Sequence, residues 1–549
     1  MNGHARSSRA AMAGAIVAFF AFRLLYGLSS DLFFEDETQI YLMGLRYYAT
    51  GAWPHFGPDV VWTKSEIPGA LQSLLIGLPF KLAPYPEAPY VLLNLLSLAA
   101  LAAFAWYITV HLPQLPRWLV WSWLMTLPWT INFSTHIINP SYILAPAIAF
   151  FIGFFEVIPA FSRKKLPEPL AFLLMGAAIS WIMQIHMSWP LLVPFAALAW
   201  ALARRRGPIG MLGNAAALLV GWLIFATVLM PTFVTYGLHA GSGNTLRNLH
   251  IRPASPSIAL STLARFFSFA SLEIWRFIAA DDGVKTMVLL RHLWIVPVAL
   301  VVWFAGIWQP LWMLREWFQP RSPLPEWRPL KWLVAGTIGF IYLSYWFVLE
   351  PAQAHAFYLT APVAFLFAAY CWTFVDSPRW RTIAAVLIAS NVVFHLWQAS
   401  VWIPERSVYR NREAVAAAIR RKEPEMFAHR RAFAVEPGPL RLNDPSRPWE
   451  PHRDITLTNE NLRMGPRHIA VWTFSVRNGN EKVAYRDVMY RTHYRDTNGV
   501  EVDVRYGFLK DIMQPGTTVA AEVIDGIISA PFTTATIELL GAEALVPIR

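Results

Sequence analysis

Three consecutive acids, Glu35, Asp36 and Glu37, follow the first long apolar stretch of the sequence. Carboxylates beside an apolar membrane surface are costly to ionise, because like charges and a low dielectric both oppose the charged form. Such a group is either fully solvated or functional, for example as a general base that takes a proton from an attacking hydroxyl. Solvated acids are also common on the outer side of membrane proteins, so both interpretations stand.

The segment after the acids holds a second pair of charged residues. A short helical pattern over 41–48 leads into a Gly/Pro-rich turn over 51–59, and Lys64 and Glu66 then precede Ile67-Pro68-Gly69. Lys64 is a candidate phosphate contact. The alternative is a surface lysine whose apolar stem lies along the membrane while its ammonium reaches water.

Further polar residues fall at turns between apolar stretches. His136 and Asn139 lie at one such turn, and Gln184 and His186 at another. Ionisable groups near the ends of membrane helices are candidates for function. His136 and Asn139 alternatively cap the helix that follows Pro140, and Gln184 and His186 alternatively form an interhelical hydrogen bond.

Two more groups of candidates lie later in the chain. The long segment 232–285 contains Arg247 and Arg252, and arginine suits phosphate recognition through its planar fork of donors. Contact with anionic lipid is the alternative. His355 and Tyr358 are three residues apart, a spacing that places both on one face of a helix.

These residues require a membrane framework to bring them together. Of the 549 residues, 56% are hydrophobic and 15% are charged, whereas soluble domains carry about 25% charged residues. The apolar stretches predict an all-α polytopic membrane domain with about eleven spans over residues 1–402. The expected spans are 10–29, 88–110, 118–134, 141–160, 170–187, 189–203, 212–231, 286–312, 331–349, 355–375 and 381–402. The stretch 67–83 is too short to span and predicts a helix in the membrane interface.

The basic residues predict the orientation of this domain. Arg117, the run 163–165, the run 204–206 and the arginines near 315–328 and 379–381 fall in alternate loops, which are cytoplasmic by the positive-inside rule. We therefore expect a multi-pass plasma-membrane protein with a cytoplasmic N-terminus, whose long loops 30–67 and 232–285 are external. The net charge of +11 reflects the same bias, and no nucleic-acid partner is expected.

The C-terminal part predicts a separate soluble domain. Residues 403–436 read as a linker with an amphipathic helix, and residues 437–549 alternate in hydrophobicity between turns such as Asn478-Gly479 and Asn498-Gly499. This pattern is typical of an immunoglobulin-like β-sandwich, here expected on the periplasmic or extracellular side as an accessory or docking module. Cys371 is the only cysteine, so this domain has no disulfide.

Taken together, residues 10–375 resemble the GT-C superfamily of membrane glycosyltransferases, and within it the protein O-mannosyltransferases and the lipid A aminoarabinose transferases. The resemblance rests on an acidic pair after the first span and a Lys/Pro-containing stretch before the next short helix. It implies a polyprenyl-phosphate sugar donor and an acceptor hydroxyl that attacks from the outer face. Asp36 matches the general base and Glu37 the second acid, although Glu35 leaves the register open by one residue.

The resemblance also implies roles for the other candidates. Lys64 and Glu66 stand where the aminoarabinose transferases carry a Glu-Lys pair, but in reversed order, and His355 would stabilise the leaving phosphate. The lack of a second acidic motif near His136 favours a reaction without a metal or other cofactor. The implied partners are membrane lipids, the donor, and a glycan, lipid or protein acceptor. The alternative is a non-enzymatic transporter or envelope assembly scaffold; a transporter is expected to show internal repeats, and the sequence has no convincing one.

Overall fold

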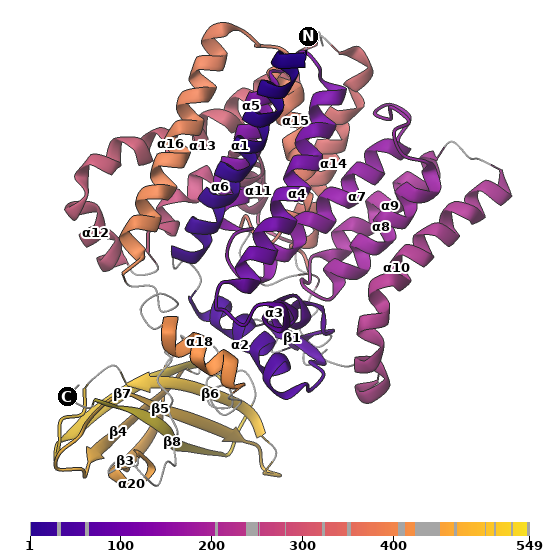
Figure 1. Cartoon of the computed structure of the whole chain (residues 1–549). Coiled ribbons are helices and arrows are strands. Elements are labelled where there is room, and N and C mark those ends of the chain that lie inside the picture. Colours follow the sequence, from indigo (N-terminus) through magenta and orange to yellow (C-terminus); the bar gives the residue numbers. More distant parts are fainter. Residues whose placement is uncertain are drawn as a thin grey trace. The chain divides into compact units, whose positions relative to one another are not determined.

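The structure is a computed structural model that forms two compact units, residues 1–422 with 432–435 and residues 423–431 with 436–549. We describe each unit by itself (Figure 1). The residues described are 2–29, 34–60, 65–203, 207–237, 251, 253–279, 282–320, 324–347, 353–404, 412–422, 451–465, 469–499, 501–509, 512–528 and 531–545.

In its described residues, the first unit consists of helices and one antiparallel hairpin of two strands, β1 and β2. Its first half contains α1 (Asn2–Ser29), α2 (Phe34–Thr50), β1 (Phe56–Val60), β2 (Ser65–Pro68), α3 (Leu71–Leu82), α4 (Ala88–His111), α5 (Arg117–Thr126), α6 (Pro128–Asn132), η1 (Asn139–Ile143), α7 (Leu144–Val157), α8 (Glu168–Met183), η2 (Trp189–Leu192), α9 (Val193–Leu202) and α10 (Pro208–Tyr236). Its second half contains α11 (Pro256–Ser268), η3 (Ser271–Phe277), α12 (Asp282–Arg291), η4 (Leu293–Ile295), α13 (Val296–Phe318), η5 (Pro325–Trp327), α14 (Pro329–Ser344), η6 (Tyr358–Thr360), α15 (Ala361–Trp372), α16 (Pro378–Trp402) and α18 (Arg412–Arg421).

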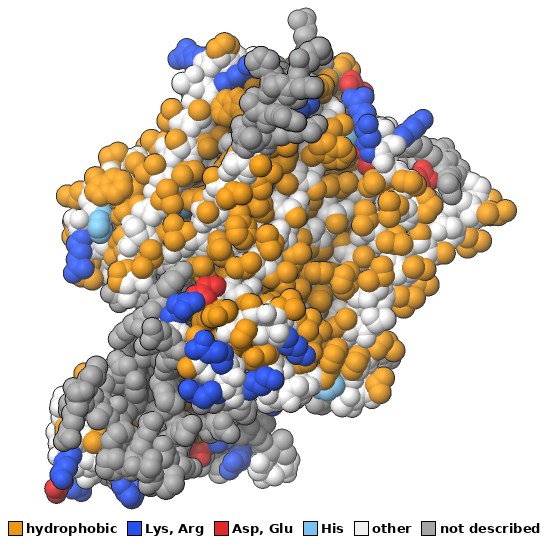
Figure 2. Space-filling view, viewed as in Figure 1, with side chains coloured by type: hydrophobic (Ala, Val, Ile, Leu, Met, Phe, Trp, Pro, Cys, Tyr) orange, Lys and Arg blue, Asp and Glu red, His pale blue; other side chains and the backbone are white. Residues whose placement is uncertain are grey.

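The long apolar helices confirm a multi-pass membrane domain. Among the described residues, six helices are long and apolar enough to cross a membrane, or seven if the bent pair α11 and η3 is one span. Figure 2 shows the surface between the ends of these helices covered almost wholly by hydrophobic side chains. Fewer helices meet this length than the eleven expected, since the spans expected at 170–187, 189–203 and 355–375 contain shorter apolar helices.

Prolines explain two further differences from the expected spans. The span expected over 118–134 breaks between α5 and α6, where Pro128 has no N–H to continue the ladder and Leu127 is extended. The segment 232–285, expected as a loop, contains α11 and η3. Pro256 begins α11, and the Ser255 hydroxyl accepts from the N–H of Ser257 as a helix cap.

The guanidinium of Arg23 holds the break between α5 and α6 together. Arg23 lies in α1 and is fully buried. Its nitrogens donate to the carbonyls of Met125 (3.1 Å) and Thr130 (3.1 Å) and to the Ser134 hydroxyl (2.6 Å). Where the helix breaks, backbone carbonyls lose their helical N–H partners. The Arg23 guanidinium supplies these carbonyls with a donor inside the helical unit.

At one end of the unit, α2 and α3 pack with almost no space between their backbones. A Cβ atom added to Gly44 would lie 2.4 Å from the side chain of Ile76, and one added to Gly77 would lie 2.6 Å from the carbonyl oxygen of Gly44. The short helix expected over 67–83 is present as α3. Its Leu82 side chain is 91% exposed, as suits a helix at a membrane interface. In Figure 1 the N-terminus of α1 lies at the opposite end of the unit.

The second unit is a β-sandwich of two antiparallel three-stranded sheets, in the orders β3-β4-β7 and β6-β5-β8. In chain order, the first, second and fifth strands form one sheet, and the fourth, third and sixth form the other. Immunoglobulin-type sandwiches divide their strands between two sheets in this way. The expected fold class is therefore confirmed. The elements are α20 (Pro451–Asp454), β3 (Ile455–Met464), β4 (Ile469–Asn478), β5 (Ala484–Arg495), β6 (Glu501–Leu509), β7 (Thr518–Ile527) and β8 (Thr534–Leu545).

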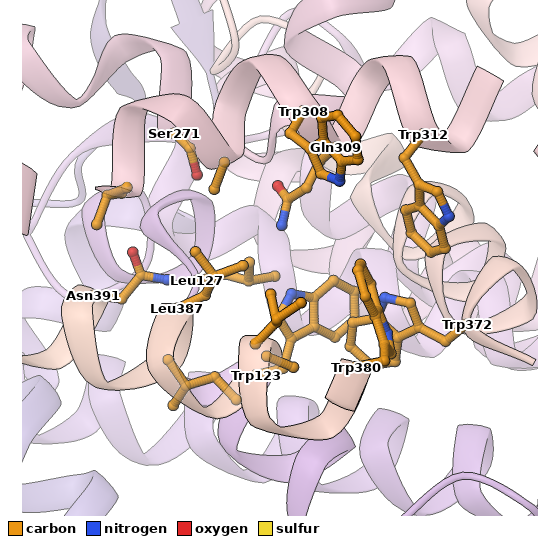
Figure 3. A pocket seen from close by; sticks show the side chains of 15 residues that line it. Trp123, Leu127, Ser271, Trp308, Gln309, Trp312, Trp372, Trp380, Leu387 and Asn391 are labelled. Atoms are coloured by element: carbon orange, nitrogen blue, oxygen red, sulfur yellow. The ribbon is translucent and has the colours of Figure 1, made fainter. Parts of the chain in front are cut away.

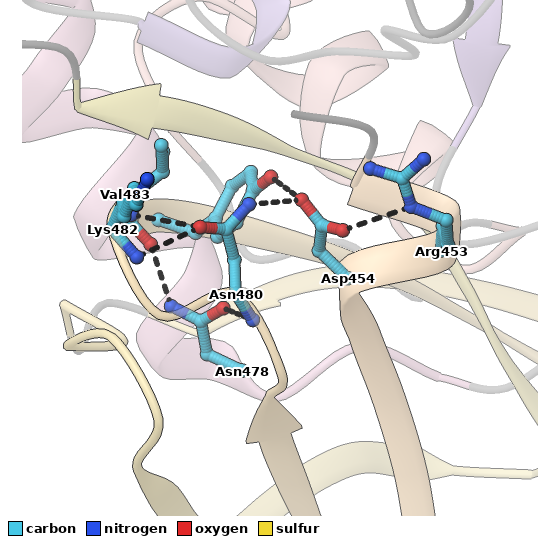
Figure 4. A network of polar contacts seen from close by, with 7 residues as sticks. Arg453, Asp454, Asn478, Asn480, Lys482 and Val483 are labelled. Atoms are coloured by element: carbon cyan, nitrogen blue, oxygen red, sulfur yellow. Dashed lines mark hydrogen bonds and ion pairs between the residues drawn. The ribbon is translucent and has the colours of Figure 1, made fainter. Parts of the chain in front are cut away.

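Side chains from both sheets form the core of the sandwich, and a polar network closes one end (Figure 4). Asp454 accepts from the Asn480 amide (2.7 Å) and the Tyr485 hydroxyl (2.5 Å). Asn478 donates to the carbonyl of Val483 (2.9 Å), which fixes the turn between β4 and β5. These contacts join strands to turns, so they stabilise the fold of this unit.

Candidate functional site

Glu37 is the acid of the first cluster whose side chain the structure describes, and it is 4% exposed. Its Oε1 accepts from the Tyr90 hydroxyl (3.0 Å) and from the backbone N–H of Ile137 (3.3 Å). Tyr90 lies in the first turn of α4, and Ile137 follows α6 in the chain. Two donors from separate elements therefore hold a buried carboxylate at the first turn of α2.

Several of the other candidate residues lie outside what the structure describes. The backbone of Glu35 and Asp36 belongs to α2 and that of Glu66 to β2, but their side chains are outside the described atoms. Lys64, Arg247 and Arg252 are outside the described residues altogether.

Contacts with α8 and α10 fix the hairpin that carries Glu66. Gly69, with φ +124°, ends the hairpin, and a Cβ there would lie 2.7 Å from the side chain of Gln184. The Thr232 hydroxyl donates to the carbonyl of His55 (2.8 Å). Gln184 itself donates to the carbonyl of Phe225 (2.8 Å), so the interhelical hydrogen bond expected for this residue is confirmed.

His136 is fully buried and directly precedes Ile137, whose N–H binds Glu37. Its Nδ1 lies 3.0 Å from the Thr135 hydroxyl, and its ring meets that of Tyr26 edge-on at 5.2 Å. The amide oxygen of Asn139 accepts from Gln72 of α3 (3.3 Å). Neither His136 nor Asn139 is the N-cap residue of η1, which is Ile138.

His355 lies within electrostatic range of His186 and Arg276, and we call these three residues the second polar group. His186 follows α8, Arg276 lies in η3, and His355 precedes η6. His186 Nδ1 accepts from the Ser188 N–H (3.2 Å), which leaves its other ring nitrogen to carry the proton. Burial lowers the pKa of His186 to about 4. Burial, followed by the charges of His186 and Arg276, lowers the pKa of His355 to about 3. Both imidazoles are therefore neutral at pH 7. Arg276 Nη1 donates to the Gln353 side chain (2.7 Å).

Tyr358 lies behind this group, in the aromatic core. It is fully buried, and its ring centroid lies 5.6 Å from Trp129 and 5.8 Å from Phe133. Phe133 also contacts the His355 ring (6.1 Å). Tyr358 therefore packs the ring set that supports His355.

The segment 133–137 connects the two polar groups. Ile137 binds Glu37 at one end of this segment, and Phe133 contacts His355 at the other. Of the predicted set, Glu37 and His355 thus contact the two ends of this segment, His136 belongs to it, and His186 lies within electrostatic range of His355. Such an arrangement provides a held carboxylate on one side, and on the other a guanidinium with two neutral imidazoles, groups that bind phosphate oxygens by donating hydrogen bonds.

Two contributors were not among the predicted site residues. Tyr90 is one of several tyrosines near the ends of spans, and its sequence context does not single it out. Arg276 and Arg265 both lie in the segment 232–285, and no local pattern distinguishes them. In the structure Arg265 pairs with Glu273 (2.5 Å), whereas Arg276 donates to Gln353, two residues before His355.

Comparisons with known proteins give similar structures but no similar sequences. No protein-family model and no curated protein match the chain. ArnT from Cupriavidus metallidurans bound to undecaprenyl phosphate has 13% identity and a TM-score of 0.45, over 75% of this chain and 73% of that one. The arabinosyltransferase EmbB from Mycobacterium smegmatis has 12% identity and a TM-score of 0.39, over 97% of this chain and 64% of that one. A likeness of this size carries no conclusion about activity.

Proposed function

We propose that the first unit is a GT-C type membrane glycosyltransferase, which moves a sugar from a polyprenyl-phosphate donor to an acceptor of the cell envelope. One observation carries the proposal: the segment 133–137 joins a buried, doubly bound acid to a group of one arginine and two neutral histidines. Sugar transfer from a phosphate needs a base for the acceptor and donors for the leaving group.

In this proposal the acids serve the acceptor. The acceptor oxygen attacks the anomeric carbon while the bond from that carbon to the phosphate oxygen breaks, and the configuration inverts. The acceptor proton passes to Asp36, which precedes Glu37 in the first turn of α2. Glu37 fixes this turn through Tyr90 and Ile137.

The cationic group serves the donor. Arg276 supplies a charge to the phosphate, which leaves with the electron pair of the broken bond. His186 and His355 supply neutral N–H donors, so the bound phosphate stays anionic until it departs. Lys64, Glu66, Arg247 and Arg252 remain proposed substrate contacts, and His136 a proposed contact beside Glu37. Undecaprenyl phosphate, which one of the similar structures holds, is a lipid of the proposed donor class.

We also propose that this end of the unit faces the periplasm or exterior. The acids follow α1, whereas Arg117, the run 163–165 and Arg379 lie at helix ends that the positive-inside rule assigns to the cytoplasm.

A reconstituted assay tests the proposal. The full chain in lipid nanodiscs receives a radiolabelled polyprenyl-phosphate sugar and a membrane extract as acceptor, and transfer of label to an acceptor is the expected result. Asp36→Asn is expected to insert normally and to transfer no label. Transfer by Asp36→Asn at the wild-type rate would contradict the role of Asp36. A transporter or scaffold would give no transfer with either protein. Mass spectrometry of envelope glycans and lipids, with and without the gene, then identifies the sugar and acceptor.

A further inference from the structure

A crevice lined by tryptophans lies between α5, α13, α15 and α16, away from the proposed site (Figure 3). Trp308, Gln309 and Trp312 of α13 form one wall, and Trp380 and Leu387 of α16 face them. Its free volume is about 50 Å³, enough for part of a narrow chain. Trp123 meets the ring of Trp372 at 4.5 Å, so packed rings form its inner side, and Trp312 meets that of Trp380 at 5.0 Å, where the two walls come into contact.

The crevice opens toward the side of the helices that faces lipid. Trp308 is 62% exposed, and Leu311 and Ile383 are also exposed. The large exposed side chains of these two spans, α13 and α16, are apolar except for arginines near one end, so hydrocarbon rather than water surrounds the opening.

The length of the crevice matches one leaflet of a bilayer. Along α16 it extends from Trp380 to Asn391, eleven residues apart, or roughly 16 Å at ~1.5 Å per residue. Half of a ~30 Å hydrocarbon core is about 15 Å. An acyl chain that lies along the crevice, parallel to the helices, therefore has the length to run from the membrane surface to the level of Asn391, near the middle of the span, with part of the chain in the free space.

The shallow end of the crevice identifies the leaflet. The Tyr26 hydroxyl, late in α1, contacts the Gln398 side chain (3.1 Å), late in α16, so the two helices run in the same direction. Trp380, early in α16, therefore lies at the end where α1 begins, the end farthest from α2 and α3 (Figure 1).

Basic residues surround this shallow end. Arg379 is exposed next to Trp380, and the Arg315 side chain, one turn beyond Trp312, is 72% exposed. Arg381 is already bound by Asp376 (2.8 and 2.7 Å), and Arg315 lies 3.9 Å from Glu316. Two arginines at the level of the lipid headgroups attract a phosphate.

We infer that this crevice binds one anionic phospholipid from the leaflet at the N-terminal end of α1. An acyl chain fills the space between Trp308 and Trp380, and the phosphate pairs with Arg315 and Arg379. The site is separate from the proposed donor site, which lies at the other end of the same helices.

Photo-crosslinking and native mass spectrometry of the full chain test this inference. Nanodiscs contain either phosphatidylglycerol or phosphatidylcholine with a diazirine on the acyl chain. We expect crosslinks on α13 and α16 inside the crevice, several-fold stronger with phosphatidylglycerol, and one retained phospholipid per chain by mass. Equal labelling by both lipids would contradict the inferred preference for an anionic headgroup. Crosslinks spread evenly over all exposed helices, as for a crevice that holds only water, would overturn the site itself.

Variants give an independent check. Ala384→Phe fills the crevice and is expected to abolish the retained lipid, whereas Leu300→Phe, on the exposed side of α13, retains it. The double variant Arg315→Gln, Arg379→Gln leaves the crevice for the acyl chain unchanged, and it is expected to lose the preference for phosphatidylglycerol. Thermal unfolding shows whether Ala384→Phe is folded, and a folded Ala384→Phe that retains the lipid contradicts the inference.

Discussion

The guanidinium of Arg276 donates to the side-chain oxygen of Gln353 at 2.7 Å, which ties η3 to the segment just before η6. Gln353 is two residues from His355, so this hydrogen bond places a charged donor beside a neutral imidazole. The two residues are 77 positions apart in the chain, and their contact exists only because α12, α13 and α14, which lie between them in the sequence, fold back.

We expect Arg276→Gln to weaken donor binding. A hydrogen bond to a charged group contributes about 1.5–3 kcal/mol, so KM for the polyprenyl-phosphate sugar should rise roughly 10- to 150-fold. Steady-state kinetics in nanodiscs measure this change. Arg291→Gln, an exposed arginine at the end of α12, is the matched control and should keep the wild-type KM. An unchanged KM in Arg276→Gln would remove this residue from the site.

Asp36→Asn should reduce kcat rather than donor binding. Loss of a general base lowers the rate by about 10²–10⁴-fold, while the amide keeps the size of the carboxylate. Single-turnover transfer measures the step, and the melting temperature should match that of the wild type.

Glu37→Gln should behave differently from Asp36→Asn. Oε1 of Glu37 accepts from both Tyr90 and Ile137, and the amide oxygen that replaces it carries no charge, so both hydrogen bonds become weaker. We expect a lower melting temperature together with lower activity. Tyr90→Phe, which removes one of the two donors, should reproduce part of the same shift. A Glu37→Gln variant as stable as the wild type would mean that these hydrogen bonds do not hold the turn.

Stability should fall in mild acid because of His186 and His355. Burial lowers the pKa of these residues to about 4 and about 3, below the ~6.5 of an exposed histidine. Between these values the unfolded chain binds protons that the folded chain does not. Their contribution to stability is thus complete above pH 6.5, and it is lost as the pH falls toward 4.

Melting temperatures from pH 7.5 to 4.5 check this dependence. The double variant His186→Asn, His355→Asn should show a flatter profile than the wild type. His292→Asn, at the start of η4, should keep the wild-type profile. An equally steep profile in the double variant would assign the acid sensitivity to other groups.

Arg23→Met should destabilise the first unit. The change removes the Arg23 donor from the buried Met125 carbonyl and one of the two donors from the Thr130 carbonyl, which also accepts from the Ser134 hydroxyl, at a cost of about 1–3 kcal/mol. Thermal unfolding in nanodiscs measures the loss. Arg46→Met, an exposed arginine of α2, should have little effect.

The parts of the structure that follow from local patterns were predictable. Alternation at Trp472 and Phe474 indicated β4, and long apolar stretches indicated α4, α10 and α16, since these patterns depend only on neighbours along the chain. The break at Pro128 was readable in the same way, although the expected span ran through it.

The composition of the site was only partly predictable. The turns that hold His136, His186 and His355 stood out, because a polar residue at the end of an apolar helix is unusual. Which arginine of the segment 232–285 meets His355 depends on how η3 folds back against α13, and no local pattern carries that information.

The position of Arg23 has a consequence for biosynthesis. It belongs to α1, yet its partner at Met125 is 102 residues further along the chain, so α1 is made well before α5. An arginine within a lone helix costs about 2.5–3.5 kcal/mol at the membrane centre. We therefore expect the newly made α1 to stay near the translocon, in a hydrated or protein-lined environment, until α5 and α6 are synthesised. The burial of this helix is completed by residues made much later.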